Sequence, residues 1–226
     1  MDLESHYNTL YESSIEKIKA DAYQIDELIQ NATDRRFGIT LLIRPSTAVK
    51  NEIQKFLKHL NTIEPHQYYY KNSDIHITVM SIISCYDGFD LDNIDISKYV
   101  EIIKKSIITH PKIDIEFKGL TASPSCIMVQ GFMNNDVLNA IRDKLRMRFK
   151  NTTLEQSLDK RYAIQTAHAT VVRFSEHFKN KTEFLTAIES YKNHNFGTFK
   201  VTNLELVYND WYQKEEHVKT LFNFNI

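Results

Sequence analysis

Two short runs of the sequence share a pattern in which a histidine is followed two residues later by a threonine. The first run contains His76 and Thr78, and the second contains His168 and Thr170. The runs read IHITV over residues 75–79 and AHATV over residues 167–171. Residues two apart in a β-strand lie on the same face. Each run therefore predicts an imidazole and a hydroxyl on one face of a strand, with apolar side chains on the other.

Histidine and threonine in this arrangement suit the cleavage of a phosphodiester. Histidine titrates near neutral pH, so one imidazole can take a proton from the attacking oxygen while the other gives one to the leaving oxygen. The threonine hydroxyls can bind the non-bridging phosphate oxygens as charge develops there. Such a site needs no metal and no cofactor. One run alone would more often mark a structural histidine, but two matching runs favour catalysis by His76 and His168, with phosphate bound by Thr78 and Thr170.

The elements around these runs alternate between strand and helix patterns. We expect strands at 37–43, 75–83, 113–117, 126–132, 166–174, 199–208 and 217–224, and helices at 46–60, 96–109, 135–149 and 183–191. Ser46 or Thr47 is a suitable cap for the first of these helices. The alternation predicts a mixed α/β (α+β) protein with helices outside its sheets.

The first 35 residues predict an N-terminal helical extension beside a single main domain at residues 36–226. Apolar residues recur every three or four positions from Leu3 to Ile18, and Ile25, Leu28 and Ile29 continue the pattern. We expect a helical hairpin packed on the main domain. The alternative is an oligomerisation element, and the sequence leaves the oligomeric state open, a monomer being one state that it allows.

The composition narrows the class of protein and of partner. The 226 residues are 42% hydrophobic and carry a net charge of -1. This neutral balance argues against a partner that is a long nucleic acid duplex and favours a short RNA or nucleotide. No apolar run is long enough for a membrane span, and the N-terminus has no secretory pattern. Cys85 and Cys126 lack metal-site spacing, so we expect reduced thiols in a cytoplasmic protein.

The two histidine runs resemble the signature of the 2H phosphoesterase superfamily. The resemblance covers roughly residues 37–226 and includes FGITLLIRP, NSDIHITVMSII, IDIEFKGLTASPSCIMVQGF, AHATVVRF and FKVTNLELVYNDWY. It implies two lobes of mixed or antiparallel sheet with outer helices and a central cleft that holds both histidines. It also implies a metal-independent hydrolase of 2′,3′-cyclic phosphates, 2′-5′ linkages or related nucleotide phosphodiesters. Some members are identified as 2′-5′ RNA ligases, and others degrade 2′-5′ oligoadenylate or cyclic oligonucleotide signals of antiviral defence.

The sequence departs from the RNA ligase-like members at two places. Ala167 stands where many of them have proline before the second histidine, and Ser81 begins a Ser-Ile-Ile run where they often have a Phe-Leu-Gly type turn. These departures favour the superfamily over its RNA ligase group. Arg173 follows Thr170 by three residues, and strict alternation places it on the face opposite His168, so binding phosphate would require a bend in the strand.

Aromatic side chains near the expected cleft are candidates for stacking a nucleobase. Trp211 and Tyr212 follow the strand expected beside the second histidine run, and Tyr69 lies shortly before the first. Stacking of this kind contributes roughly 1–3 kcal/mol per base, although most aromatic residues serve in packing. A non-catalytic module that binds RNA ends, and an interaction protein that acts through its N-terminal helices, are the alternatives to an enzyme.

Overall fold

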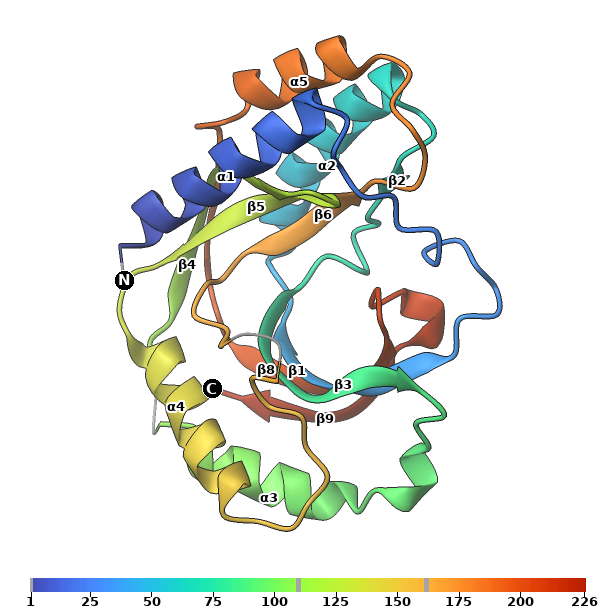
Figure 1. The fold of residues 1–226 in the computed structure, drawn as a ribbon. Coiled ribbons are helices and arrows are strands. Elements are labelled where there is room, and N and C mark those ends of the chain that lie inside the picture. Colours follow the sequence, from blue (N-terminus) through green and yellow to red (C-terminus); the bar gives the residue numbers. More distant parts are fainter. Residues whose placement is uncertain (1, 109–110, 161–162) are drawn as a thin grey trace.

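A computed structural model describes residues 2–108, 111–160 and 163–226 of the chain. The described residues form two antiparallel β-sheets that face each other, with helices on their outer sides (Figure 1). The predicted mixed α+β class, with two lobes and outer helices, is confirmed.

The first sheet has four strands and curls around the centre of the molecule (Figure 1). Its order is β3 (Ile77–Asp87), β1 (Arg36–Ile43), β8 (Asn203–Asp210) and β9 (Lys219–Asn225). The apolar run FGITLLI forms β1, which lies between β3 and β8 and is almost fully buried. The strand that follows His76 is therefore the edge strand of this sheet.

The second sheet has five strands. Its order is β2 (Tyr68–Tyr69), β6 (Ala169–Arg173), β5 (Cys126–Met133), β4 (Asp114–Ser123) and β7 (Asn195–Lys200). The strand that follows His168 is β6, so each of the two sheets carries one histidine run. The prediction of a single strand at 199–208 is wrong, because this stretch belongs to two strands. The chain leaves the second sheet after Lys200 and enters the first sheet at Asn203. Only Val201 and Thr202 separate the two strands, and neither residue type marks a break.

The helices divide between the two sheets. They are α1 (Leu3–Lys19), α2 (Thr47–Ile63), α3 (Ile96–Ser106), α4 (Val137–Lys150) and α5 (Lys181–Ser190), with short 3₁₀ turns η1 (Leu91–Asn93) and η2 (Glu215–His217). Helices α1 and α2 pack on the five-stranded sheet, and α5 packs on α2 (Figure 1). Helices α3 and α4 contact each other, and in the four-stranded sheet α3 contacts β9 and α4 contacts β3. Ser46 caps α2, as expected. The helix predicted at 96–109 corresponds to α3, and its predicted last residue, 109, lies outside the described residues. No helix in the described part of the chain is long and apolar enough to cross a membrane.

The N-terminal segment forms one helix rather than the expected hairpin. Helix α1 buries Tyr7, Tyr11 and Ile18 against the five-stranded sheet, and residues 20–35 then run as turns and extended chain. The extended part uses its backbone for long-range contacts, because Gln24 and Asp26 donate N–H hydrogen bonds to carbonyl oxygens of residues 124 and 174, at 2.8 and 2.7 Å. These bonds take the place of the intrahelical bonds that the apolar spacing predicts.

Candidate active site

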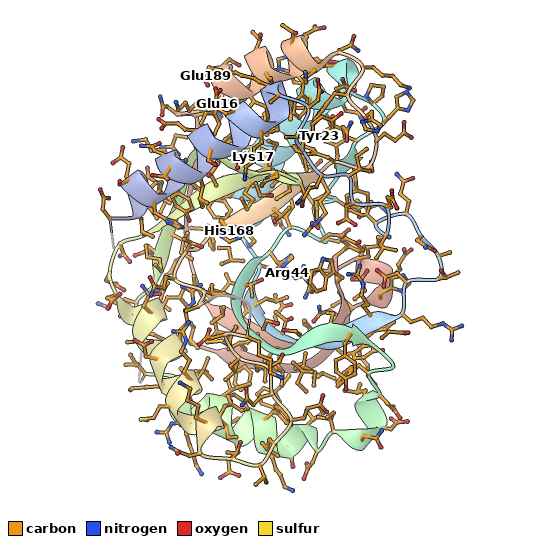
Figure 2. The ribbon with its side chains drawn as sticks, viewed as in Figure 1. Glu16, Lys17, Tyr23, Arg44, His168 and Glu189 are labelled. Atoms are coloured by element: carbon orange, nitrogen blue, oxygen red, sulfur yellow. The ribbon has the colours of Figure 1, made fainter. Side chains whose placement is uncertain are left out.

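A cavity of about 200 Å³ is lined by residues from both sheets. His76 and Thr78 reach it from the start of β3, and His168 and Thr170 reach it from the start of β6. Figure 2 shows His168 between the two sheets. The apolar residues that alternate with these four side chains are fully buried behind them, namely Ile75, Ile77, Val79, Ala167, Ala169 and Val171. The structure thus brings the four residues singled out by the sequence into one cavity.

Each imidazole is held by a hydrogen bond to its Nδ1 atom. The Nδ1 of His76 lies 2.7 Å from the backbone oxygen of Asp74, and the Nδ1 of His168 lies 2.7 Å from the Oγ1 of Thr166. A carbonyl oxygen only accepts, so the proton of neutral His76 resides on Nδ1 and its Nε2 has a lone pair. Both histidines are half-buried and line the cavity. Because Nδ1 of each ring is already hydrogen-bonded, Nε2 is the nitrogen available to a substrate.

Both histidines have a pKa well below 7, so each imidazole is uncharged at neutral pH. Burial lowers the pKa of His76 to about 4; the bond to Asp74 opposes this shift, and the nearby charges of Arg44, His168 and Arg173 add to it. Burial likewise lowers the pKa of His168 to about 4, helped by the positive charge of Arg142. A bound phosphate dianion or monoanion would favour the imidazolium form, because opposite charges stabilise one another in a buried site.

A β-bulge in β6 places Arg173 in the cavity. Thr170 pairs with Met128 and Val172 pairs with Ile127, so Val171 is an extra residue in the ladder. The bulge reverses the alternation after Thr170. The prediction that Arg173 lies on the face opposite His168 is therefore wrong, because its side chain lines the same cavity.

Bulges in β3 have a similar effect. The register of β3 against β1 shifts between Thr78 and Met80 and again between Ser81 and Ile83. Thr78, Ser81 and Ser84 consequently line the cavity at intervals of three residues. Ser81 is the first residue of the Ser-Ile-Ile run that departs from the family pattern. Repeated polar residues at this interval were the one sequence signal that could have identified Ser81 and Ser84.

Arg142 of α4 connects the two histidine segments from behind. It is fully buried and donates from Nε to the backbone oxygen of Val79 at 3.0 Å, and from Nη2 to those of Thr78 and Thr166 at 3.1 and 2.7 Å. One guanidinium therefore ties the strand of the first histidine to the segment that leads to the second. Burial lowers the pKa of Arg142 to about 10, which still leaves it charged at neutral pH.

The three aromatic candidates lie in different surroundings. Trp211 lines the cavity, and the guanidinium of Arg36 lies 4.7 Å from the centre of its ring. Tyr212 is only 2% exposed and donates its hydroxyl to Asp26, while Tyr69 donates its own to the backbone of Glu64. Neither tyrosine is a lining residue of the cavity. Tyr70, the next residue of the same aromatic run, does line it.

The described residues contain no group of three or more histidine, cysteine, aspartate or glutamate side chains placed to hold a metal ion. The cavity is instead lined by two imidazoles, several hydroxyls and the guanidinium of Arg173. This set of side chains can bind an anion through hydrogen bonds and exchange protons with it.

Comparisons with known proteins find similarity in structure and none in sequence. No protein-family model and no curated protein matches the sequence. A crystal structure of Escherichia coli LigT complexed with 3′-AMP aligns with a TM-score of 0.56 at 13% identity, over 84% of this chain and 98% of that one. A crystal structure of a phosphoesterase aligns at 0.51 and 12% identity, over 84% and 98%.

A third solved structure, that of the conserved protein ATU0111 from Agrobacterium tumefaciens, aligns with a TM-score of 0.52 at 11% identity, over 92% of this chain and 97% of that one. At identities this low, the three alignments show that the fold is shared and nothing more. The two-lobed fold implied by the 2H phosphoesterase resemblance is thereby confirmed.

Proposed function

We propose that this protein is a phosphodiesterase that uses His76 and His168 as an acid–base pair on a nucleotide or an RNA end. The observation that carries the proposal is the convergence of two matching histidine–threonine pairs, from two different sheets, on one cavity. The resemblance to the 2H phosphoesterases and the fold shared with LigT and a phosphoesterase support it.

The cavity provides a group for each step of the reaction. One imidazole removes the proton from the attacking oxygen, and the other, protonated on Nε2, gives its proton to the leaving oxygen. The hydroxyls of Thr78 and Thr170 and the guanidinium of Arg173 donate hydrogen bonds to the non-bridging oxygens, where negative charge grows in the transition state. Because the low pKa of each histidine keeps it neutral in the free enzyme, the anionic substrate itself promotes protonation of the acid.

The substrate that fits best is short. A cavity of about 200 Å³ accommodates a phosphate and part of one nucleotide rather than a long chain. Trp211, which lines the cavity, is our candidate for stacking a base, and such stacking would contribute roughly 1–3 kcal/mol. A crystal structure of LigT contains 3′-AMP, a single nucleotide. Candidates are therefore a nucleoside 2′,3′-cyclic phosphate, a 2′-5′ dinucleotide and a small cyclic oligonucleotide.

A small substrate panel in excess EDTA tests the proposal. It contains a nucleoside 2′,3′-cyclic phosphate, a 2′-5′ diadenylate, a 3′-5′ diadenylate and a cyclic dinucleotide. We expect turnover of at least one, reduced roughly 10²–10⁴-fold in His76→Ala and in His168→Ala, because each removes one proton-transfer step. His66→Ala, at an exposed histidine, is the matched control and should keep full activity.

Three outcomes would contradict the proposal. Turnover that persists in either catalytic variant would exclude the two-histidine mechanism, and turnover that EDTA abolishes would exclude metal independence. Binding of 3′-AMP without turnover of any substrate would favour the non-catalytic RNA-end module.

A further inference from the structure

The N-terminal helix reaches the second histidine from behind the five-stranded sheet. Tyr7 of α1 is buried, and its hydroxyl donates to the backbone oxygen of Gly131 at 3.2 Å. Gly131 lies against Ala167, so closely that a Cβ atom on Gly131 would be 2.0 Å from the Ala167 oxygen. The Tyr7 hydroxyl therefore sits at the backbone that immediately precedes His168.

The hydrogen bonds at Tyr7 hold the backbone behind His168. The Tyr7 hydroxyl donates to the Gly131 oxygen, and its own oxygen accepts a hydrogen bond from the Gly131 N–H at 3.4 Å. Ala167, which Gly131 packs against, lies between Thr166 and His168, and the Oγ1 of Thr166 lies 2.7 Å from the Nδ1 of His168. Tyr7 therefore supports the segment that carries both His168 and the hydroxyl group that holds its ring.

A second residue of the N-terminal segment reaches the cavity at Arg173. The carboxylate of Asp26 accepts hydrogen bonds from Nη1 of Arg173 at 3.2 Å and from the Tyr212 hydroxyl at 2.7 Å. The Nε of Arg173 donates to the Tyr70 hydroxyl at 3.1 Å. The side chains of Arg173 and Asp26 are 19% and 17% exposed, so the ion pair is largely shielded from water. Asp26 is itself fixed by the bond from its N–H to the backbone of Phe174.

We propose that the N-terminal segment supports the active site at two residues, where Tyr7 holds the backbone behind His168 and Asp26 holds Arg173 in place. This inference rests on the proposed function. It gives the N-terminal segment a role in the reaction, in contrast to the alternative of an interaction protein that acts through its N-terminal helices. Tyr7 and Asp26 are positioning residues, because each acts on the cavity through another side chain.

Conservative substitutions in the full-length chain test each contact. Tyr7→Phe removes only the hydroxyl, so the N–H and oxygen of Gly131 lose this partner beside the segment that carries His168. We expect about a fivefold to tenfold loss of kcat, the size of one hydrogen bond. Tyr11→Phe is the matched control, because Tyr11 lies one turn further along α1 and its hydroxyl bonds to Glu189, outside the cavity.

Asp26→Asn keeps the shape of the side chain and removes its charge. We expect kcat to fall about tenfold, less than the roughly 100-fold loss that follows removal of a charge-stabilising donor itself. The affinity for inorganic phosphate should stay equal or rise, because a negative charge beside the cavity is lost. A merely structural role would instead weaken phosphate binding along with folding. Asp21→Asn is the control, since Asp21 pairs with Lys181 on the surface and its φ of 55° suits asparagine.

Nitrogen-15 NMR separates this inference from the proposed function, because it requires no turnover. The ring nitrogen signals of His168 should keep their wild-type positions in Tyr11→Phe and move in Tyr7→Phe. The Arg173 Nε–H signal should move in Asp26→Asn and not in Asp21→Asn. An inactive wild type with these spectra would overturn only the proposed function. An active wild type whose Tyr7 and Asp26 variants match their controls in rate and spectrum would overturn the inference.

Discussion

At the scale of single residues, the two histidines are prepared to bind an anion rather than to titrate freely. Their pKa values near 4 come mainly from burial, and the surrounding cations lower them further. Arg142 and Arg173 therefore each help to keep an imidazole neutral, and Arg173, which lines the cavity, is also available to an anion there. Burying neutral imidazoles in this way makes the folded state sensitive to acid.

We expect the free energy of unfolding to fall as the pH drops from about 6.5 to 4. An unfolded histidine binds its proton near pH 6.5, whereas folded His76 and His168 bind theirs only near pH 4, so acid favours the unfolded chain. The stability is fully present above pH 6.5, and each histidine contributes a slope of up to about 1.4 kcal/mol per pH unit below it. Urea unfolding at pH 7, 6 and 5 measures this slope.

Glutamine variants show which histidines cause the pH dependence of the free energy of unfolding. His76→Gln and His168→Gln should each flatten the pH dependence, whereas His66→Gln, at an exposed position, should not. Equal slopes in all three variants would show that the imidazoles are not held neutral in the folded protein.

At the scale of elements, the site depends on irregularities in regular strands. The histidine–threonine positions follow from simple alternation, so His76, Thr78, His168 and Thr170 could be placed from the sequence. Arg173 could not, because a bulge changes the register of a strand without changing its apolar pattern. The contacts of Tyr7 and Asp26 were missed for a related reason, since they join residues more than 100 positions apart in the sequence.

Arg142 shows a signal that was present but not used. In the predicted helix at 135–149, Leu138, Leu145 and Phe149 define the buried stripe, and Arg142 lies on that stripe. An arginine among apolar positions indicates a buried guanidinium with several backbone partners. Which carbonyl groups it would meet depends on the packing of α4 against β3, which the sequence pattern does not specify.

Gly131→Ala tests how tightly the elements beside His168 are packed. Its added Cβ would meet the oxygen of Ala167 at 2.0 Å and the carbonyl carbon at 2.7 Å, so backbone must move. We expect a loss of about 3 kcal/mol or more in the free energy of unfolding and a loss of turnover, because the displaced segment carries His168. Urea unfolding and the cyclic phosphate assay measure the two effects.

Gly88→Ala is the matched control for that substitution. Gly88 has a φ of 84° but no neighbour within 4 Å of an added Cβ, so only the backbone strain of about 1–2 kcal/mol applies. Its turnover should match the wild type. Similar losses of activity in both variants would mean that general destabilisation, and not displacement of the second histidine segment, is responsible.

At the scale of the whole molecule, the site exists only where the two sheets meet. Each sheet supplies one histidine, Arg142 joins their segments, and the N-terminal segment connects the lobes through Asp26, which pairs with Arg173 of one sheet and accepts from Tyr212, which follows β8 of the other. Positive charge is gathered at this junction while the chain as a whole has a net charge of -1. An anion is therefore recognised locally, without a basic surface that would follow a long nucleic acid.

This distribution of charge predicts a weak dependence of activity on salt. A substrate that engages one or two phosphates should give a slope of log kcat/KM against log salt concentration of about -1.4 or shallower. The slope should not steepen when the oligonucleotide is lengthened from two to eight residues, because a chain with a net charge of -1 has no excess of basic side chains for the added phosphates. Lys105→Ala, at an exposed lysine of α3, should leave the slope unchanged. A slope that steepens with substrate length would instead require a basic track outside the cavity, and the substrate would then be an extended RNA.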